Sequence, residues 1–356
     1  MPVLWLQVER KGTMKPEYRV PSMAEIAALP WNGLTVASTF SGAGGSCLGY
    51  RMAGYRVAYA AEFIESARDT YKANHPDSYL DPRDVREIRG SEILDIVGGP
   101  VDILDGSPPC ASFSTAGKRE AGWGKVKAYS DGAQRTDDLF DEFIRLVGEV
   151  RPRVFVAENV SGLVKGTAKG YFIRVMQGLK AKGYRVACRV LDASWLGVPQ
   201  SRQRTIFVGV REDLGRQPAH PEPFESRITL RVAIAGGIDG MCQNLGGDLL
   251  RIYKLQRPGE SRFDACIRLG RKGGGLGKVR LSWGKPTPTM TQSGYDLYHP
   301  ELPRTLTIPE VKRICSFPDD FKLCGTFEQQ WERLGRAVPP LMMREIAATL
   351  RDKVLT

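Results

Sequence analysis

A cysteine in a proline-restricted turn is the first candidate for chemistry. The sequence Gly106-Ser107-Pro108-Pro109-Cys110-Ala111-Ser112 directly follows a short apolar run over 101–105. The two prolines restrict the backbone just before Cys110, at the carboxyl end of a predicted strand, where α/β sheets place their ligands. A lone cysteine is usually a small buried apolar residue, but this setting makes Cys110 a better candidate nucleophile than the other six cysteines.

A carboxylate and a basic motif lie at the ends of two other predicted strands. Glu158, in Glu158-Asn159-Val160, leaves the apolar strand predicted over 154–158, so it is partly desolvated and suited to hold or donate a proton. The motif Gln200-Ser201-Arg202-Gln203-Arg204 precedes the strand predicted over 205–210. If its alternate residues continue that strand, two cations and an amide converge on one face and suit a planar polar ligand or a phosphate. The alternative is an exposed basic edge.

A glycine-rich turn, Phe40-Ser41-Gly42-Ala43-Gly44-Gly45, follows the strand predicted over 34–40. Glycines there allow a tight turn and a close approach of the backbone to a cofactor, although glycine-rich turns after strands are common. The turn lacks the Lys and Ser/Thr of a phosphate-binding P-loop, which argues against a nucleoside triphosphatase. It also departs from GxGxxG, because Cys47 takes the place of the third glycine.

Two acidic residues further along the chain fit a nucleoside cofactor. Glu62 follows the strand predicted over 57–61, about twenty residues after the turn, where a carboxylate commonly binds ribose hydroxyls. Asp84, followed by Val85, could accept a hydrogen bond from an adenine amino group. For each acid the alternative is a solvated surface charge.

These motifs lie within an alternation of predicted strands and helices from about residue 34 to 210. Further strands are predicted over 103–105 and 184–191, and helices over 66–74, 137–150 and 170–182. Such alternation indicates an α/β fold with a mainly parallel sheet. Before it, Ser22 and Glu25 form a capping-box pattern that predicts a short helix over 23–29.

The pattern changes in residues 215–300, which are rich in Gly, Pro and Arg and poor in periodicity. Within 247–285 ten basic residues stand against three acidic ones, a local excess of +7. Regular patterning returns over 306–317 and in a helix predicted over 341–355. We therefore divide the chain into a lead-in (1–33), an α/β domain that carries the motifs (34–214), a basic insertion (215–300) and a segment that returns to the α/β domain (301–356).

Composition limits the function classes further. The 356 residues include 51 Lys and Arg and 40 Asp and Glu, so the net charge is +11 and the pI is near 9.3. Such a basic chain points to a polyanionic partner, with nucleic acid the first candidate. No apolar run approaches the roughly 18–20 residues of a membrane helix, and the first 18 residues contain no signal-peptide core. Seven cysteines without CxxC spacing and three histidines indicate neither a disulfide framework nor a zinc site, so we expect a cytoplasmic protein without metal or membrane partner.

Taken in order, these segments resemble the cytosine-C5 DNA methyltransferase family over residues 34–350. The matching segments are FSGAGG, Glu62, Asp84, PPCASFS, DLFDEFIRLV, ENV, QSRQR, RTLTIPEVKRICSFPDDF and LGRAVPPLMMREIA. No single segment is decisive, but their order and intervals are specific. The resemblance implies a Rossmann-like, S-adenosyl-L-methionine-dependent domain, a smaller irregular target-recognition domain over 215–300, and a monomer that modifies cytosine in duplex DNA.

The resemblance also implies a mechanism. The Cys110 thiolate adds to cytosine C6 while Glu158 protonates or hydrogen-bonds N3, and C5 then takes the methyl group of S-adenosyl-L-methionine. A base removes the C5 proton and Cys110 leaves. Arg204, with Arg202 in support, would hold the base and stabilise charge on the addition intermediate. Because the target atom is inaccessible in a duplex, the base must be flipped out, and residues 117–135 would form the loop that closes over it.

The implied binding residues fall into two sets. The cofactor contacts are Phe40, Gly42, Ala43, Gly44, Gly45, Glu62, Phe63, Asp84, Val85, Pro109, Arg336 and Val338. The DNA contacts, whose Arg and Lys would read base edges and hold phosphates, are Ser112, Gln200, Arg251, Lys254, Arg257, Arg268, Arg271 and Lys272.

Two positions depart from the family's pattern. Ala111 stands where the family usually has Gln, which would weaken a polar contact beside the nucleophile or to DNA. Arg336 stands in the motif Gly335-Arg336-Ala337-Val338-Pro339-Pro340 where the family has Asn against the cofactor. A guanidinium should repel a sulfonium unless an anion intervenes. One such anion is a carboxylate on the transferred group, as in carboxy-S-adenosyl-L-methionine, because Arg can bind it bidentately.

Several hypotheses therefore stay open. Methyl transfer is the first, with Arg336 turned outward or paired with the methionyl carboxylate, and transfer of a carboxymethyl group is the alternative. A tRNA cytosine-5 methyltransferase would share the same motifs. A non-enzymatic nucleic-acid-binding module would explain the charge but not Cys110, Glu158 and Arg204 together. The sequence leaves a restriction–modification, phage or solitary setting open.

Overall fold

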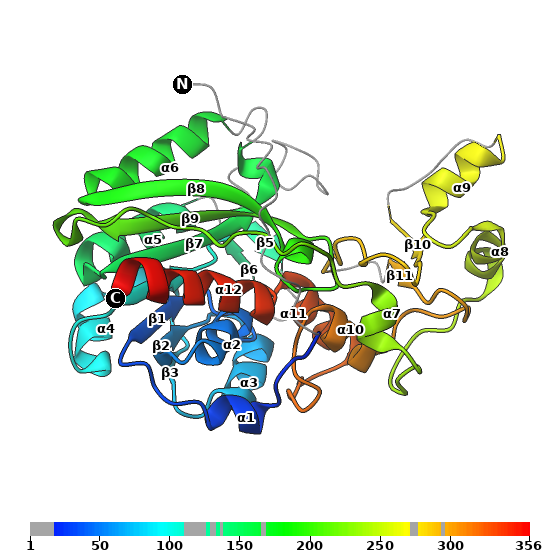
Figure 1. Ribbon diagram of the computed structural model, residues 1–356, viewed down its shortest axis with the longest axis horizontal. Coiled ribbons are helices and arrows are strands. Elements are labelled where there is room, and N and C mark those ends of the chain that lie inside the picture. The colour runs from blue at the N-terminus through cyan, green and yellow to red at the C-terminus, as the bar shows by residue number, and fades with distance from the viewer. Residues whose placement is uncertain are drawn as a thin grey trace.

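A computed structural model of the chain describes residues 18–109, 126–128, 133–135, 138–164, 169–270, 277–292 and 296–356. Its centre is a seven-stranded sheet with the strand order β3-β2-β1-β4-β7-β9-β8 (Figure 1). The first five strands in this order run parallel, whereas β9 is antiparallel to both β7 and β8. The prediction of an α/β fold with a mostly parallel sheet is confirmed.

Six of the seven strands were predicted from runs of apolar and β-branched residues, and their ends shift by no more than two residues. They are β1 (Thr35–Thr39), β2 (Arg56–Ala61), β4 (Ile103–Gly106), β7 (Val154–Val160), β8 (Tyr184–Asp192) and β9 (Gln203–Arg211). The edge strand β3 (Tyr79–Asp81) was not predicted, because three residues are too short for a pattern. Two short strands, β5 (Val126–Ala128) and β6 (Ala133–Arg135), pair with each other outside this sheet.

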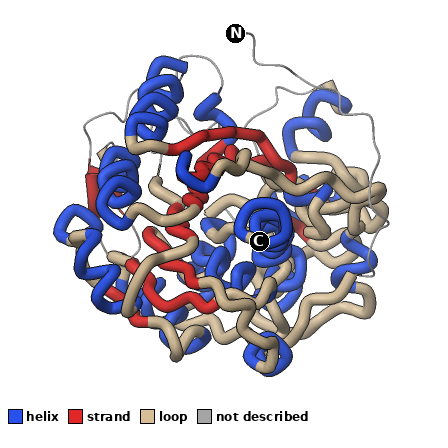
Figure 2. Tube along the Cα trace, turned by 60° about the vertical axis from the view of Figure 1, so that its left-hand side comes forward, coloured by secondary structure: helices blue, strands red, loops and turns tan. Residues whose placement is uncertain are grey.

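Helices cover both faces of the sheet, as Figure 2 shows in a view onto the C-terminal end of the chain. The core of one face includes residues of α4 (Gly90–Val97), α5 (Leu139–Val150) and α6 (Lys169–Ala181). The core of the other face includes residues of α2 (Gly45–Met52), α3 (Glu65–Asn74) and α12 (Pro340–Leu350), the last continued by a π-helical turn (Arg351–Leu355). Predicted helices 66–74, 137–150 and 170–182 correspond to α3, α5 and α6, whereas α2 and α4 were missed.

The lead-in is attached to the C-terminal segment. Helix α1 (Met23–Ala27) has the predicted capping box of Ser22 and Glu25, although it ends two residues earlier than expected. The Met23 amide donates to the Asp320 carboxylate at 3.0 Å, and Tyr18 Oη donates to the Arg313 carbonyl at 2.5 Å. Residues close to the start of the chain are thus held by residues near its end.

Residues 215–300 contain more regular structure than their sequence indicates. They form α7 (Leu230–Ile234), α8 (Gly247–Leu255), α9 (Arg262–Arg268) and the strand pair β10 (Val279–Arg280) with β11 (Leu297–Tyr298). In Figure 1, α8 and α9 project away from the sheet. Because these helices are short and largely exposed, they leave only a weak periodic pattern. None of the helices in the described residues is long and apolar enough to cross a membrane.

The C-terminal segment contributes α10 (Ile308–Ile314), α11 (Phe327–Arg336) and α12. Helix α12 packs closely on α2, because a Cβ at Gly49 would lie 2.5 Å from Met343 Cβ and 2.6 Å from the Pro340 carbonyl. Position 49 therefore has room only for a glycine. This contact brings the end of the chain onto the helix that begins at the glycine-rich turn.

Candidate active site

The parallel strands bring most of the predicted motifs to one edge of the sheet. Strands β1, β2, β4 and β7 all end there, so the segments that follow them lie on the same side. The first is the glycine-rich turn after β1, the second is Glu62 after β2, and the third is the Pro108-Pro109 turn after β4. Glu158 lies in the last part of β7. The carboxyl edge of a parallel sheet is where such folds bind ligands.

The glycine-rich turn has backbone angles and close contacts that residues with a side chain could not easily adopt. Gly42 and Gly44 have positive φ values of 56° and 88°, and Phe40 before them has φ of 55°. A Cβ at Gly45 would lie 2.4 Å from the Val338 carbonyl. The turn is thus packed directly against the segment that follows Arg336, and both lie at the N-terminus of α2.

Glu62 is fixed at the end of β2 by two backbone amides. Its carboxylate accepts hydrogen bonds from the amides of Gly42 and Ile64, each at 2.7 Å. Burial raises the pKa of Glu62, whereas these amides and the charges of Arg333 and Arg336 lower it. Each oxygen keeps a further lone pair, so the carboxylate can still accept ribose hydroxyls.

Three further predicted cofactor contacts, Phe63, Val85 and Asp84, differ in how accessible they are. Phe63 exposes its ring beside Glu62, and Val85 is buried. The Asp84 carboxylate caps the turn Val85–Glu87 through the Arg86 amide and also forms an ion pair with the Arg86 guanidinium at 2.9 Å. An adenine amino group would therefore share Asp84 with Arg86.

The turn before the candidate nucleophile is held by a residue to which the sequence assigned no role. Asn159 is buried in β7, and its Nδ2 donates to the Pro108 carbonyl at 3.1 Å. Pro109 is half-buried beside it. Cys110, Ala111 and Ser112 lie outside the described residues, as does the predicted closing loop 117–135 apart from β5 and β6.

Glu158 and Arg204 form an ion pair across the antiparallel strands β7 and β9. Arg204 Nε lies 2.7 Å from Glu158 Oε1, and only 13% and 12% of the two side chains is exposed. Burial lowers the pKa of Arg204, and the Glu158 carboxylate counteracts part of this effect. Arg204 Nη1 also donates to the Gln203 carbonyl at 2.7 Å. One edge of the carboxylate and the guanidinium donors not used in these two contacts are left for a small polar ligand.

The predicted convergence of Gln200, Arg202 and Arg204 is wrong, because β9 begins only at Gln203. Arg202 turns into the core and donates to the carbonyls of Met290 and Arg336 at 3.2 and 3.3 Å. Burial lowers its pKa to about 9. Gln200 is fully buried, where its amide contacts the Met290 backbone and the Cys315 thiol. In this structure Gln200 therefore has no surface that DNA could contact.

Asp105 is a polar residue that the sequence analysis did not select. It is buried in β4, accepts hydrogen bonds from Ser38 Oγ at 3.1 Å and Tyr50 Oη at 3.2 Å, and lies on the same face of the sheet as Glu158. Burial raises the pKa of Asp105 to about 7. The sequence signal is an acid at the end of the apolar strand predicted over 103–105, which does not by itself indicate a buried carboxyl.

We expect Asp105 to make the protein less stable as pH rises. In the unfolded chain this carboxyl releases its proton near pH 4, whereas the folded protein keeps it until about pH 7. Between these values rising pH favours unfolding, and the contribution is lost above pH 7. The free energy of unfolding of Asp105→Asn, measured relative to the wild type, should therefore rise by roughly 3 kcal/mol between pH 5 and pH 8. Urea unfolding at both pH values measures this, and an equal difference at the two would contradict it.

Arg336 lies at the cofactor side of the edge. It ends α11, its Nε lies 2.8 Å from Glu332 Oε1, and 33% of its side chain is exposed. Its charge acts on Glu62, and Val338, two residues further on, contacts the glycine-rich turn. The guanidinium is thus close to the carboxylate that fits a ribose.

The predicted DNA contacts in the basic insertion are mostly accessible. Arg251, Lys254 and Arg257 are exposed on and after α8, with Arg251 3.5 Å from Asp248. Arg268 is bound within the insertion, because it pairs with Glu260 at 2.9 Å and donates to the Leu255 carbonyl. Arg271 and Lys272 lie outside the described residues.

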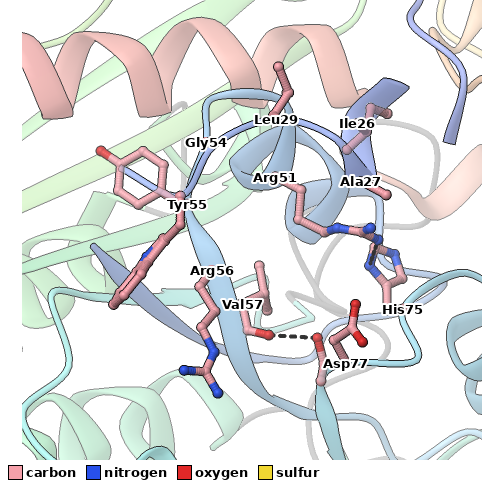
Figure 3. A pocket seen from close by; sticks show the side chains of 12 residues that line it. Ile26, Ala27, Leu29, Arg51, Gly54, Tyr55, Arg56, Val57, His75 and Asp77 are labelled. Carbon is pink, nitrogen blue, oxygen red and sulfur yellow. Dashed lines mark hydrogen bonds between the residues drawn. The ribbon is translucent and has the colours of Figure 1, made fainter. Parts of the chain in front are cut away.

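A separate cavity of about 330 Å³ lies at the opposite edge of the sheet (Figure 3). It lies beside the start of β2 at Arg56 and Val57, with Arg51, His75 and Asp77 in its wall. It contains none of the predicted site residues. No cluster of three metal-binding side chains occurs within the ranges that the structure describes.

Comparisons with known proteins agree with this arrangement. The profile of the C-5 cytosine-specific DNA methylase family matches residues 34–352. The Type II methyltransferase M1.HphI of Haemophilus parahaemolyticus is 33% identical over 328 residues, which cover 88% of this chain and 86% of that protein. The Type II methyltransferase M.Sau96I of Staphylococcus aureus is 28% identical over 354 residues, which cover 94% and 80%.

A solved structure shows the same fold. A putative DNA modification methyltransferase encoded within an E. coli prophage matches 91% of this chain and 100% of its own, with a TM-score of 0.72 and 23% sequence identity. The profile match over residues 34–352 includes the glycine-rich turn and the motifs at Cys110, Glu158, Arg204 and Arg336, and the relative from Haemophilus matches 88% of the chain. The chain belongs to the C-5 cytosine-specific DNA methylase family.

Proposed function

We propose that the protein flips a cytosine out of duplex DNA and methylates its C5 atom through a covalent Cys110 adduct. The observation that carries this proposal is the buried Glu158–Arg204 ion pair beside the Pro108-Pro109 turn. It supplies an acid and a cation at one point, near the turn that precedes the residue that would attack the ring. The protein would act as a monomer in the cytoplasm of a bacterial cell, in a restriction–modification system or on behalf of a phage.

In the proposed reaction each group has a defined task. The Cys110 thiolate forms a bond to C6 while Glu158 delivers a proton or hydrogen bond to N3, so that electron density moves to C5. Arg204 holds the base and stabilises the charge on the ring, with Glu158 fixing its direction. Asn159 keeps the turn before Cys110 in place through the Pro108 carbonyl. After transfer, a base removes the C5 proton and the thiolate leaves.

The edge of the sheet fits S-adenosyl-L-methionine. A Cβ at Gly44 would lie 2.2 Å from His75 Nε2, and one at Gly45 would lie 2.4 Å from the Val338 carbonyl, so this turn accepts only glycine and can present its backbone to a cofactor. Glu62 would bind the ribose, and Phe63 and Asp84 would bind the adenine. When bound, the cofactor supplies an electrophilic methyl group. No metal is needed for this chemistry.

Mass spectrometry of nucleosides tests the proposal directly. Duplex DNA is incubated with the protein and with S-adenosyl-L-methionine and carboxy-S-adenosyl-L-methionine in competition. We expect 5-methylcytosine, and the absence of any modified cytosine would overturn the proposal. Adding tRNA as a competing substrate tests the RNA alternative, which the basic insertion disfavours because its exposed cations suit a duplex.

A carboxymethyltransferase that uses carboxy-S-adenosyl-L-methionine is the second candidate function. Its specific support is that Arg336 directly precedes Ala337 and Val338, which contact Gly45 of the glycine-rich turn, and that its charge acts on Glu62. There it could bind a carboxylate on the transferred group and remove the repulsion between guanidinium and sulfonium.

Arg336→Asn distinguishes the two functions. If Arg336 binds the transferred carboxylate, the variant should shift its preference toward S-adenosyl-L-methionine by about 10-fold or more, because a charge-assisted hydrogen bond is lost. The ratio of 5-carboxymethylcytosine to 5-methylcytosine in the competition assay measures the shift. An unchanged ratio would leave methyl transfer as the function.

A further inference from the structure

Arg333 is a buried cation that the proposed mechanism does not use. It lies on α11, and only 4% of its side chain is exposed. Its Nε and Nη2 atoms form no hydrogen bond within the part of the chain that the structure describes. The nearest anion is Glu332, whose Oε1 lies 3.1 Å from Nη2. Since buried donors without acceptors are costly, this guanidinium is suited to a ligand that completes its hydrogen bonds.

Arg333 and Arg336 form one charged pair. They are three residues apart on α11 and therefore lie on neighbouring turns of the same face. A single oxygen, Glu332 Oε1, contacts Nη2 of Arg333 and Nε of Arg336, the latter at 2.8 Å. Glu332 thus ties the two guanidiniums together through one carboxylate oxygen.

The pair lies near Glu62 and the glycine-rich turn. Both guanidiniums act electrostatically on Glu62, and the segment just after Arg336 contacts the glycine-rich turn. Glu62 accepts the Gly42 and Ile64 amides at 2.7 Å, and within the described residues it does not accept a hydrogen bond from the buried Nε and Nη2 donors of Arg333. A carboxylate bound here would satisfy these donors. Two planar guanidiniums side by side match a carboxylate, which accepts parallel hydrogen bonds.

We propose that Arg333 and Arg336 form a carboxylate clamp at the proposed cofactor site, and that Glu332 limits its strength. The inference rests on the proposed cofactor site, and it adds Arg333 and Glu332 as residues that determine cofactor specificity. The carboxylate has two possible sources on a cofactor of this type. One is the carboxylate of the methionyl group, and the other is a carboxylate on the transferred group.

Calorimetric titration of the DNA-free protein distinguishes these sources. The three probes are decarboxylated S-adenosylmethionine, S-adenosylmethionine and carboxy-S-adenosylmethionine, which carry zero, one and two carboxylates. Arg333→Gln should weaken the clamped ligand about 10- to 100-fold and leave the decarboxylated probe unchanged. If binding of both S-adenosylmethionine and carboxy-S-adenosylmethionine weakens, the clamp binds the methionyl carboxylate. If only binding of carboxy-S-adenosylmethionine weakens, the clamp binds the carboxylate of the transferred group. Equal weakening of all three probes, or no change, overturns the proposal.

Glu332→Gln should change ligand binding in the opposite direction to Arg333→Gln. The amide keeps a hydrogen-bond acceptor for the two guanidiniums but removes the competing negative charge, so the clamped ligand should bind several-fold more tightly relative to the decarboxylated probe. If Arg333→Gln does not fold, this variant decides alone, and an unchanged or lower ratio overturns the clamp. Arg344→Gln is the matched control, because Arg344 pairs with Glu345 on α12. Binding is measured without DNA, so a failure to modify cytosine would refute the proposed reaction and leave this result standing.

Discussion

Replacing Cys110 with alanine should abolish covalent capture of DNA that contains 5-fluorocytosine and reduce cytosine modification by at least about 10⁴-fold. Without a thiolate on C6, C5 is too weak a nucleophile to attack an alkyl group. Binding to the duplex should change little, because phosphate contacts supply most of the affinity. Adducts are measured by denaturing electrophoresis of the protein–DNA mixture, and binding is measured by titration at fixed salt concentration.

Cys188→Ala is the matched control for this experiment. Cys188 lies in β8, and burial raises the pKa of its thiol to about 12, so it contributes no thiolate near neutral pH. The control should therefore form the adduct at the wild-type rate. An adduct in Cys110→Ala would mean that another residue is the nucleophile. Loss of both adduct and duplex binding would instead indicate that the variant does not fold.

The strands and the order of motifs were accessible from the sequence because both depend on local composition. Residues 154–157 are all apolar and include two β-branched valines, which is typical of a strand buried on two faces. Parallel neighbours then bring the ends of successive strands to one edge whatever the details of packing. For this reason the glycine-rich turn, Glu62, Pro109 and Glu158 could be assigned to one site in advance.

The contacts made by β9 could not be derived in this way. Glu158 pairs with Arg204 because β9 runs antiparallel to β7, with Val160 opposite Arg204. The local pattern gave neither that direction nor the point where the strand begins. Gln200 is the clearest example. It lies before the first residue of β9 and forms a bridge with Thr287, so its side chain is buried between the insertion and the C-terminal segment.

The burial of charged residues was the other feature that could not be predicted from the sequence. Arg333 lies in α11, whose largely polar sequence is typical of an exposed helix. Its side chain is nevertheless buried in the folded protein, where α11 packs near Glu62. Asp105 is similar, since only its partners Ser38 and Tyr50, from two other elements, make it acceptable inside the sheet. Charged residues of this kind become visible only when distant segments are placed together.

Replacing Glu158 with glutamine should lower the single-turnover rate of cytosine modification about 10²- to 10⁴-fold. The amide can still donate a hydrogen bond to N3, but it cannot transfer a proton, so the ring accepts the thiolate less readily. Arg204 also loses the anion that lies 2.7 Å from its Nε. The rate is followed with labelled cofactor on one duplex. Glu142→Gln, which alters a comparable 2.8 Å pair with Arg145 on α5, should leave it unchanged.

The double variant Glu158→Gln/Arg204→Gln separates a catalytic unit from two independent residues. If the pair acts as one group on the flipped base, the double variant should be no more than about 10-fold slower than the slower single variant. Fully multiplicative losses would mean that each residue acts on a different step, with the ion pair serving only to satisfy two buried charges. A Glu158→Gln rate within about 10-fold of the wild type would exclude proton transfer by Glu158 altogether, because that transfer alone is worth more.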